Sequence, residues 1–593
     1  MIRDHIHAVV KQAIVTAQTA GALPAFELPD FIIDRPRQAG MGDYAASVAM
    51  QLARVARMGP PKIAEVIAKH IAPSDEYAVE VAAGYVNFRL SPGYLNRQIG
   101  DVLTQGAAWG NVAIGQGAAA QVEHGSANPT GYATIGTGRN VTVGDTLANT
   151  LEAAGYVVHR EWYINDRGAQ IARFGASLYT HYCAVFGVDV PLPPKGYPGD
   201  DVVAVAQAIA QRDGDRLLKL PQDEASRYLA GAGVELMMAN IKRSVERLGV
   251  RYDTFFSETS LHTSGLAERM LAELRERNVI VEHDGAIWFS EDGSPIRAGQ
   301  GVKRDDYAED DADVDEEEGA ATAVQAVVFR SPRISPDPLD RPTYFFSDVP
   351  YLWNKLVERA FKLAVYVWGE DHQADLPRLN AAARVLGLDA SAIKILIYRF
   401  ITVMRGGKEA RMGKRAGNAI WIDDLIDEVG KDAVRYTLLS RSIDTKIVFD
   451  IDVLKEQNDK NPVYYVQYGH ARICSITRKA PEALGVSADE IERQIAARPT
   501  ALEHASEFAL ARKILEWPEV VAMVVATLQP HHFTTYAYAL CSAFSKFYDD
   551  CPVFKEPRPP QDVMYSRMRL ARAAQLTLAR VLRMMGMDTP ERM

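Results

Sequence analysis

The stretch Ala120–Asp145 restricts the fold of this chain more than any other part of it. It opens with a short apolar run, Ala120–Val122, which is typical of a buried strand. A turn-rich cluster from Gly125 to Gly131 follows, and the apolar spacing from Val143 onward predicts a helix. A strand, a loop and a helix in this order form the repeating unit of doubly wound α/β sheets.

Three glycines precede the predicted helix, at Gly131, Gly136 and Gly138. Because glycine has no side chain, phosphates can approach the backbone N–H groups at the positive end of the helix. An ordinary turn between a strand and a helix explains the same glycines, so this stretch alone leaves both interpretations open.

The order of several motifs resembles the arginyl-tRNA synthetases, which are class I aminoacyl-tRNA synthetases. The motifs are Asn128-Pro-Thr-Gly131, Thr134-Ile-Gly-Thr137, Gly144-Asp145, and Tyr163-Ile-Asn-Asp166 with Gly168 and Gln170. The resemblance covers nearly the whole chain. The family's His-x-Gly-His motif corresponds to Thr134–Thr137, where both histidines are threonine, and its preceding Pro-Leu corresponds to Tyr132-Ala133.

The alternation of strands and helices predicts three domains in a chain of this length. The central one, 113–455, is predicted to be a doubly wound, parallel-sheet, Rossmann-like catalytic domain of the α/β class. It contains a mostly helical insertion at 195–277 and an acidic loop insertion at 294–342. An α+β domain, 1–112, precedes it, and an all-α domain, 456–593, follows. The resemblance implies that the outer two domains contact the tRNA corner and the anticodon.

Several individual elements are predicted from local patterns. Tyr156–Tyr163, Thr343–Asp348 and Val365–His372 are predicted to be strands, and Tyr77–Leu90 a hairpin around Ala83-Gly84. The C-terminal region is predicted to be purely helical, with a break at Pro518.

The charge of the chain is unevenly distributed. The net charge is −10, and the stretch Asp305–Glu318 holds ten carboxylates and no basic residue, so the remainder is neutral overall. A neutral body can still present a basic face to tRNA. The acidic stretch has no apolar period, and we interpret it as a solvated surface insertion without a specific role.

Composition points to a cytoplasmic protein without a membrane partner. Hydrophobic residues make up 48% and charged residues 24%, as in globular proteins. No apolar run approaches the roughly 20 residues that cross a bilayer, and the N-terminus does not resemble a signal peptide. The four cysteines lie far apart, which predicts reduced thiols and no zinc site: Cys183, Cys474, Cys541 and Cys551.

The resemblance implies an arginine site. Its residues are Glu123, Asn128, Tyr344, Asp348 and Asp371. Carboxylates bind a planar guanidinium through paired hydrogen bonds, and Glu123 and Asp348 are the acids expected to do so. No metal site is predicted, because the consecutive Glu370, Asp371 and His372 cannot all face one ion.

The resemblance also implies an ATP site. Its first part is Gly131, Thr134, Gly136 and Thr137. Its second part is the basic loop Arg405–Asn418, which resembles the family's Lys-Met-Ser-Lys-Arg loop and supplies Arg411, Met412, Lys414 and Arg415. Thr134, Thr137 and Lys414 are the predicted catalytic residues, with Lys414 stabilising the leaving pyrophosphate. Arg139 is expected to compensate, with Lys414 and Arg415, for the missing imidazoles.

The predicted activity is that of an arginine–tRNA ligase, acting as a monomer on L-arginine, ATP with Mg²⁺, and tRNA(Arg). The alternative within the family is a paralogue that binds arginine or tRNA without efficient aminoacylation. A nicotinamide-dependent oxidoreductase using Gly136, Gly138 and Glu161 is the hypothesis from another class. The sequence does not fit this hypothesis. The dinucleotide-binding motif needs a third glycine at position 141, which is valine here, and the glycines that are present lie well past the end of the strand.

Overall fold

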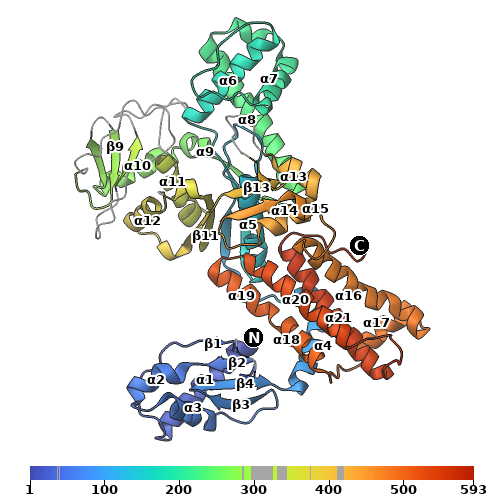
Figure 1. Ribbon diagram of the computed structural model, residues 1–593. Helices are drawn as coiled ribbons and strands as arrows, with labels where there is room; N and C mark the ends of the chain where they lie inside the picture. The colour runs from blue at the N-terminus through green and yellow to red at the C-terminus, as the bar shows by residue number, and fades with distance from the viewer. Residues whose placement is uncertain are drawn as a thin grey trace.

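The computed structural model describes residues 1–36, 38, 40–283, 286–295, 325–329, 344–373, 375–410 and 420–593. A small N-terminal unit and a bundle of long C-terminal helices lie on one side of a central sheet region (Figure 1). Three helices project from the opposite end of that region: α6 (Ala169–Val185), α7 (Asp200–Asp213) and α8 (Gln222–Arg247). The predicted fold class is confirmed.

The N-terminal unit is an antiparallel sheet packed against helices. The strands, in the spatial order β1-β2-β4-β3, are β1 (Ile33–Asp34), β2 (Tyr44–Ala46), β4 (Tyr85–Leu90) and β3 (Tyr77–Ala82). The helices of this unit are α1 (Ile2–Thr19), α2 (Val48–Ala56) and α3 (Pro60–Lys69), whereas the next helix, α4 (Pro92–Gln105), packs against the C-terminal helices. The predicted hairpin is confirmed, because Ala83 and Gly84 join β3 and β4 with φ of 51° and 85°. Two successive positive φ angles match the twist of a two-residue hairpin.

The central sheet has five parallel strands in the order β12-β11-β5-β6-β7. They are β5 (Ala119–Glu123), β6 (Val157–Ile164), β7 (Thr254–Ser257), β11 (Leu363–Gly369) and β12 (Ile393–Tyr398). The chain builds outward from β5 to β7 and then in the other direction from β11 to β12. The pair β5 and β11 is therefore a topological switch point, beside which such sheets bind ligands.

The first helix after β5 begins earlier than its pattern predicts. Helix α5 (Ile135–Ala153) starts directly after Thr134 rather than near Val143. Almost every residue of α5 is buried, including the polar Thr142 and Asp145. A helix that is buried on all sides has no polar face, so the spacing of apolar residues does not mark its start.

The predicted strands at 156–163 and 365–372 are confirmed as β6 and β11, but the one at Thr343–Asp348 is wrong. The described part of that run forms helix α11 (Tyr344–Trp353). Phe346, Val349 and Leu352 are all buried and recur at helical spacing. A short apolar run does not by itself distinguish a strand from a buried helix. A π-helical turn, Asn354–Glu358, continues α11.

The remaining elements of the central region surround the sheet. One three-stranded antiparallel sheet consists of β8 (Ile280–His283), β9 (Ala286–Ser290) and β10 (Gln325–Phe329), and another sheet of β13 (Ile401–Arg405), β14 (Lys408–Glu409) and β15 (Ile447–Asp450). The helices are α9 (Glu258–Thr263), α10 (Leu266–Glu276), α12 (Asp375–Val385), α13 (Ile422–Val429), α14 (Lys431–Leu438) and α15 (Ile451–Lys455). The acidic stretch Asp305–Glu318 lies outside the described residues.

The C-terminal region is helical, as predicted. Its helices are α16 (Pro462–Leu484), α17 (Ala488–Ala497), α18 (Ala505–Leu515), α19 (Trp517–Thr527), α20 (His531–Asp550) and α21 (Gln561–Met584). Pro518 lies in the first turn of α19, where its missing N–H costs nothing, and the predicted break is confirmed. This bundle contacts the N-terminal unit through ion pairs of Arg512 with Asp43 (2.6 Å) and Arg35 with Glu519 (3.0 Å).

A buried arginine joins α5 to the C-terminal helices. Arg435 of α14 is fully buried and donates to the Asp145 carboxylate of α5. The same guanidinium donates to the carbonyl oxygens of Leu248 (2.9 Å) and Met585 (2.5 Å). A Cβ on Gly586 would lie 2.3 Å from this group, so only glycine fits there. Arg435 thus contacts the sheet region, the end of α8 and the last helix together.

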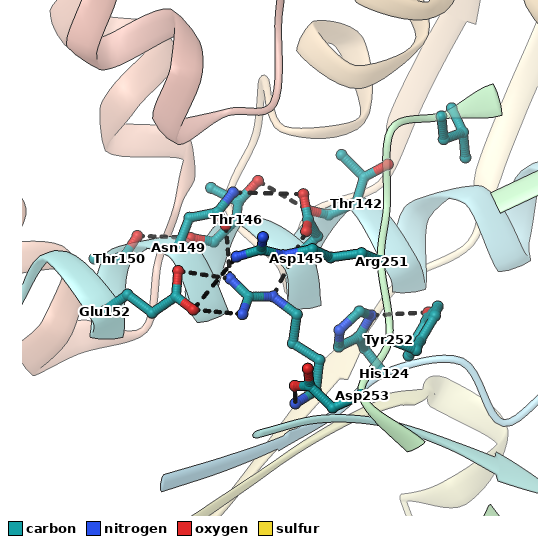
Figure 2. A network of polar contacts seen from close by, with 12 residues as sticks. His124, Thr142, Asp145, Thr146, Asn149, Thr150, Glu152, Arg251, Tyr252 and Asp253 are labelled. Carbon is teal, nitrogen blue, oxygen red and sulfur yellow. Dashed lines mark hydrogen bonds and ion pairs between the residues drawn. The ribbon is translucent and has the colours of Figure 1, made fainter. Parts of the chain in front are cut away.

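A second arginine extends this network along α5. Arg160 of β6 is 2% exposed and donates to Glu152 (2.6 Å) and Asn149 (2.8 Å). Figure 2 labels these two partners, which lie one turn apart on α5. Asn149 in turn donates to the Met584 carbonyl (3.2 Å). On the same side of the helix, His124 and Tyr252 share a hydrogen bond of 2.9 Å. Helix α5 is therefore held by side-chain contacts on several sides.

Within the described part of the chain, no helix combines the length and the apolar character that a bilayer crossing requires. The four cysteines are buried free thiols.

We expect Arg435→Met to lower the free energy of unfolding by about 3–5 kcal/mol, because the Asp145 carboxylate then stays buried without its main cation. Urea denaturation followed by circular dichroism measures the effect. Arg441→Met, at an exposed position close by, is the matched control and should change stability by less than about 0.5 kcal/mol. Equal losses of stability in Arg435→Met and Arg441→Met would contradict the stabilising role given to the Arg435–Asp145 contact.

Candidate active site

Acidic side chains gather at the carboxyl edge of the central sheet. Glu123 is the last residue of β5, Glu258 follows β7 directly as the first residue of α9, and Asp348 lies in α11. Glu123 and Glu258 are 3% and 5% exposed. The three carboxylates come from segments far apart in the sequence, and they meet beside the switch point where doubly wound sheets bind ligands.

The Glu123 carboxylate already has a cation. Lys355, on the π-helical turn after α11, is fully buried and donates its ammonium to Glu123. The ammonium lies 3.9 and 3.6 Å from the ring centroids of Tyr351 and Tyr366, and Trp368 Nε1 donates to Glu123 at 3.2 Å. The extra residue of a π-turn is common at functional sites, and here it aims Lys355 into the pocket.

Glu161 of β6 is also neutralised. Its carboxylate accepts hydrogen bonds from Tyr351 (2.7 Å), Gln121 (2.6 Å) and Arg359 (2.9 Å). The hydrogen bonds of His159 and Arg359, with the charge of Lys355, outweigh burial and lower the pKa of Glu161 to about 2. Glu161 is therefore an ionised and paired carboxylate, and it braces the floor of the pocket.

Among the described residues Asp348 and Glu258 have no ion pair of this kind, although the charge of His372 favours the ionised form of Asp348 and that of Arg167 the ionised form of Glu258. Burial, with the charge of the nearby Asp166, raises the pKa of Glu258 to about 7, although the hydrogen bond from Ser347 acts in the opposite direction. Burial and Asp375 raise the pKa of Asp348 well above its usual value. Ser347 donates to Glu258 at 2.6 Å, but no described residue forms an ion pair with either carboxylate.

Glu258 is buried and Asp348 half-buried, and withdrawal from water disfavours the charged form of both carboxylates. A ligand that brings one positive charge with several N–H donors would remove that cost and hold both groups ionised. The pocket is thus suited to a cationic group such as a guanidinium.

The loop after β5 is braced by the loop after β6. Asn128 donates to Gln170 at 2.8 Å, and Asn165 donates to the Ser126 carbonyl at 2.9 Å. Asp166 accepts from Ser257 (2.5 Å), at the end of β7. The two motifs that the sequence placed in order along the chain therefore meet in space.

Two further residues of the predicted arginine site are placed only by their backbone. Tyr344 is the first residue of α11, one turn before Asp348, and Asp371 follows β11 in a short 3-10 helix, Glu370–His372. Both positions lie in segments that also carry residues of the pocket.

The threonine motif forms the start of α5. Thr134 is the N-cap, and its hydroxyl accepts from the Thr137 N–H and faces the Thr137 hydroxyl, both at 3.5 Å. Gly136 lies between them. A Cβ on Gly131 would come within 3.0 Å of Asp201 on α7, which also accepts from the Tyr132 N–H (3.2 Å). The helical insertion therefore contacts the segment before the motif.

The segment that follows the basic loop pairs with this motif. Thr134 and Trp421 form an antiparallel bridge. It is flanked by backbone hydrogen bonds from Ile135 to Ile420 (3.3 Å) and from Ile422 to Ala133 (2.9 Å). The predicted loop residues Arg411, Met412, Lys414 and Arg415 lie outside the described residues. The described segment that follows the loop, Ile420 to Ile422, nevertheless lies beside Thr134.

The expected compensation by Arg139 is wrong. Arg139 is fully buried, and its guanidinium donates to backbone carbonyls rather than facing a ligand: those of Arg399, Ser442, Ile443 and Thr445. It fixes the ends of two loops of the sheet region. Its charge is therefore committed to the fold.

The polar cluster after β11 is occupied by local contacts. Glu370 pairs with Arg399 (2.7 Å), and His372 contacts Asp375 (3.1 Å). The described residues contain no group of three or more acidic, histidine or cysteine side chains arranged for a metal.

Sequence patterns missed Glu258 and Lys355. Glu258 lies inside the range 195–277, which reads as helical, although Thr254–Ser257 has the β-branched and aromatic residues of a strand and pairs with β6. Lys355 follows an apolar run and was indistinguishable from a surface lysine without the π-turn that turns it inward.

Two family models match the ends of the chain. The arginyl tRNA synthetase N terminal domain matches residues 2–90, and the DALR anticodon binding domain matches residues 466–593. The solved structure of a putative arginyl tRNA synthetase from Campylobacter jejuni has a TM-score of 0.70 and 26% identity, over 85% of this chain and 100% of that chain. The Thermus thermophilus arginyl-tRNA synthetase, at 20% identity and a TM-score of 0.74, covers 100% of both chains and shows the shared fold.

The fold defines a doubly wound α/β protein with a group of carboxylates at the carboxyl edge of its central sheet. Its curated relatives identify the family within this class of protein. The arginine–tRNA ligase of Moorella thermoacetica is 38% identical over 594 residues, 100% of this chain and 99% of the relative, and that of Heliobacterium modesticaldum is 36% identical over the same shares. The chain belongs to the arginine–tRNA ligase family.

We expect stability to depend on pH through Glu258. Its pKa is higher in the folded protein than in the unfolded chain, so the unliganded protein should lose stability as pH rises from about 4.5 to about 7. Glu258→Gln should be more stable than the parent at pH 8, by roughly 1–3 kcal/mol, and equal to it near pH 4.5.

Urea denaturation at both pH values measures this difference. Glu276→Gln, at an exposed glutamate, is the control and should track the parent protein. A parent protein and a Glu258→Gln variant that differ equally at both pH values would show that Glu258 is ionised throughout.

Proposed function

We propose that this chain is a working arginine–tRNA ligase. It activates L-arginine with ATP to arginyl-adenylate, releases pyrophosphate, and transfers the arginyl group to tRNA(Arg). The observation that carries the proposal is the pair of carboxylates at the carboxyl edge of the sheet, the buried Glu258 and the half-buried Asp348, which form no ion pair with a described residue. Full-length relatives of this name support the same activity.

The arginine guanidinium binds between Asp348 and Glu258, which it keeps ionised. Glu123 contributes less charge than the sequence suggests, because Lys355 neutralises it. It shapes the wall of the pocket next to Asp348. Asn128, Tyr344 and Asp371 complete the arginine site, as the resemblance implies. This arrangement selects a planar cation over a neutral side chain of similar length.

ATP binds at the start of α5, on Gly131, Thr134, Gly136 and Thr137. In this proposal the Thr134–Thr137 segment is an altered form of the family's His-x-Gly-His motif. Its position after β5, and its bridge to Trp421 beyond the basic loop, support this correspondence. Arg411, Met412, Lys414 and Arg415 approach the phosphates from that loop, and Mg²⁺ carried by ATP neutralises part of the phosphate charge.

Two observations favour the alternative function, that of a paralogue without efficient aminoacylation. The Thr134 and Thr137 hydroxyls face each other, and Arg139 is committed to backbone carbonyls. The described residues therefore supply no direct replacement for the two imidazoles. Lys414 is the remaining cation expected at the transition state.

We propose the domain boundaries 1–112, 113–455 and 456–593, a monomer, and a cytoplasmic location. The strand β5 opens the second range, and α15 closes it. Free thiols at all four cysteines are compatible with a reducing compartment.

ATP–pyrophosphate exchange and aminoacylation, each with and without tRNA(Arg), test the function. Asp348→Asn should raise the KM for arginine at least about 30-fold and change the KM for ATP less than twofold, because it removes a charge-assisted bond to the guanidinium. Lys414→Ala should lower the exchange rate at least about 10²-fold with little change in arginine affinity.

Lys408→Ala, at an exposed position of β14 in the first part of the same basic loop, is the control for Lys414 and should keep the parent rate within about twofold. A parent protein that shows no exchange with arginine, even with tRNA(Arg), would contradict the catalytic proposal and favour the paralogue. Equal losses for arginine and ATP in Asp348→Asn would contradict the assignment of Asp348.

A further inference from the structure

A series of hydrogen bonds leads from Glu258 toward solvent. Glu258 and Ser347 are 5% and 1% exposed, and a hydrogen bond of 2.6 Å joins Oε1 of the carboxyl group to Oγ of the serine. The same Oγ lies 3.2 Å from Nε2 of His262, whose imidazole is half-buried. A buried carboxyl group is therefore connected, through one hydroxyl group, to a ring that solvent reaches in part.

Two helices hold the three side chains in this order. Glu258 and His262 are four residues apart on α9, so they lie on one face of that helix. Ser347 comes from α11, which packs against α9, and it bridges the two side chains. The rings of Phe346 and His262 have centroids 5.4 Å apart, and this contact restricts the imidazole. The steps of the proposed function use neither Ser347 nor His262.

The charged groups around Glu258 oppose one another. Burial is the largest influence and, with the carboxylate of Asp166, raises the pKa of Glu258 to about 7, while Arg167 acts in the opposite direction. Asp348, from α11, adds a further negative charge when it is ionised. Tyr163 of β6 stays neutral, because burial raises its pKa well above the usual value. Near neutral pH the empty pocket therefore holds both protonated and ionised Glu258.

Ser347 and His262 satisfy either state of Glu258. Burial and the charge of Arg167 lower the pKa of His262 to about 4, so its ring is neutral, with one N–H donor and one acceptor nitrogen. An ionised Glu258 accepts from Ser347, and Ser347 accepts from the Nε2–H of His262. A protonated Glu258 donates to Ser347, which then donates to Nε2, and the ring proton is on Nδ1. Glu258 and Ser347, the two buried groups, thus keep their partners in both states.

We propose that Ser347 and His262 are positioning residues for Glu258, which let this carboxyl group hold a proton in the empty pocket and ionise when the guanidinium binds. This inference rests on the proposed function. On binding, the proton of Glu258 leaves to water, and the direction of both hydrogen bonds reverses. The Ser347 hydroxyl turns from Nε2 to the carboxylate. His262 loses the proton on Nδ1 to water and takes one up from water on Nε2, so that one proton is released in all.

The pH dependence of arginine binding tests this role. Titration calorimetry of the full-length protein gives the Kd for L-arginine without ATP. Ser347→Ala removes the donor of ionised Glu258 and should raise its pKa by about 0.5–1 unit. The Kd should therefore rise about 3–10-fold at pH 6 and less than about twofold at pH 8.5, where Glu258 is ionised in any case.

Ser260→Ala, at an exposed serine of α9, is the matched control and should follow the parent protein at both pH values. Circular dichroism checks that each variant is folded. A Kd that Ser347→Ala raises equally at pH 6 and pH 8.5 would show a purely structural role for the serine and overturn the inference, as would an unchanged Kd.

The tautomer of His262 gives a second test, which does not depend on affinity. Nitrogen NMR of protein labelled with ¹⁵N-histidine distinguishes Nδ1–H from Nε2–H, and His262→Gln identifies the signals. At pH 6, saturating L-arginine should move His262 from mainly Nδ1–H to mainly Nε2–H. At pH 8.5, and in Ser347→Ala, arginine should leave the tautomer unchanged. A parent protein whose His262 does not respond to arginine at pH 6 would contradict the proposed reversal.

Glu258→Gln separates this inference from the proposed function. If Glu258 binds the guanidinium, Glu258→Gln should raise the Kd for arginine at least about 10-fold at pH 8.5, because a charge-assisted bond is lost. Adding Ser347→Ala to Glu258→Gln should then change the Kd less than about twofold at either pH, because Ser347 acts through Glu258.

The two failures give different results. If Glu258→Gln leaves the Kd for arginine unchanged, the proposed arginine site loses Glu258, and the inference falls with it. If Glu258→Gln raises the Kd but the effect of Ser347→Ala does not depend on pH, the arginine site stands and only the role of Ser347 and His262 is refuted.

Discussion

The contact between Arg435 and Asp145 is the interaction on which the arrangement of the domains depends. The attraction in a buried ion pair offsets the free-energy cost of desolvation only when further hydrogen bonds satisfy both charged groups. Arg435 meets that condition with two backbone carbonyls, one from the end of α8 and one from the end of the last helix. Asp145 belongs to α5, and Thr134 is the N-cap of the same helix. The contact therefore attaches the C-terminal helices to the helix that begins at the threonine motif. With a rise of about 1.5 Å per residue, Thr134 and Asp145 lie about 16 Å apart along α5.

The pocket combines two electrostatic arrangements with different consequences. Glu123 and Glu161 are matched by Lys355 and Arg359, so their positions are fixed before any ligand arrives. Asp348 and Glu258 form no ion pair with a described residue, and burial raises the pKa of both. The matched pairs thus provide rigidity, and the other two carboxylates are those to which we assign the guanidinium.

The sequence predicted those parts of the fold whose patterns are local. β5, β6 and β11 are buried strands with apolar runs, and the helices around Pro518 have a clear apolar face. The start of α5 was missed because that helix has no polar face, and α11 was predicted as a strand because its apolar run is short. Of the site, Glu123 and Asp348 were predicted by resemblance. Glu258 and Lys355 were missed because β7 and a π-turn, which no local pattern marks, bring them to the pocket.

The strand order has a consequence for how the protein is made. β5 can pair with β6 soon after both are synthesised. The other edge of β5 pairs with β11, so Ala120 has no strand partner until Leu363 has been synthesised. Pairing across such a long stretch of chain is slow, because the loop must close before the contacts form. During synthesis the emerging half-sheet exposes an edge that carries Ala120 and Val122, both fully buried in the finished fold. Such an edge is prone to aggregate, and a chaperone that shields it until β11 emerges from the ribosome would raise the yield of native protein.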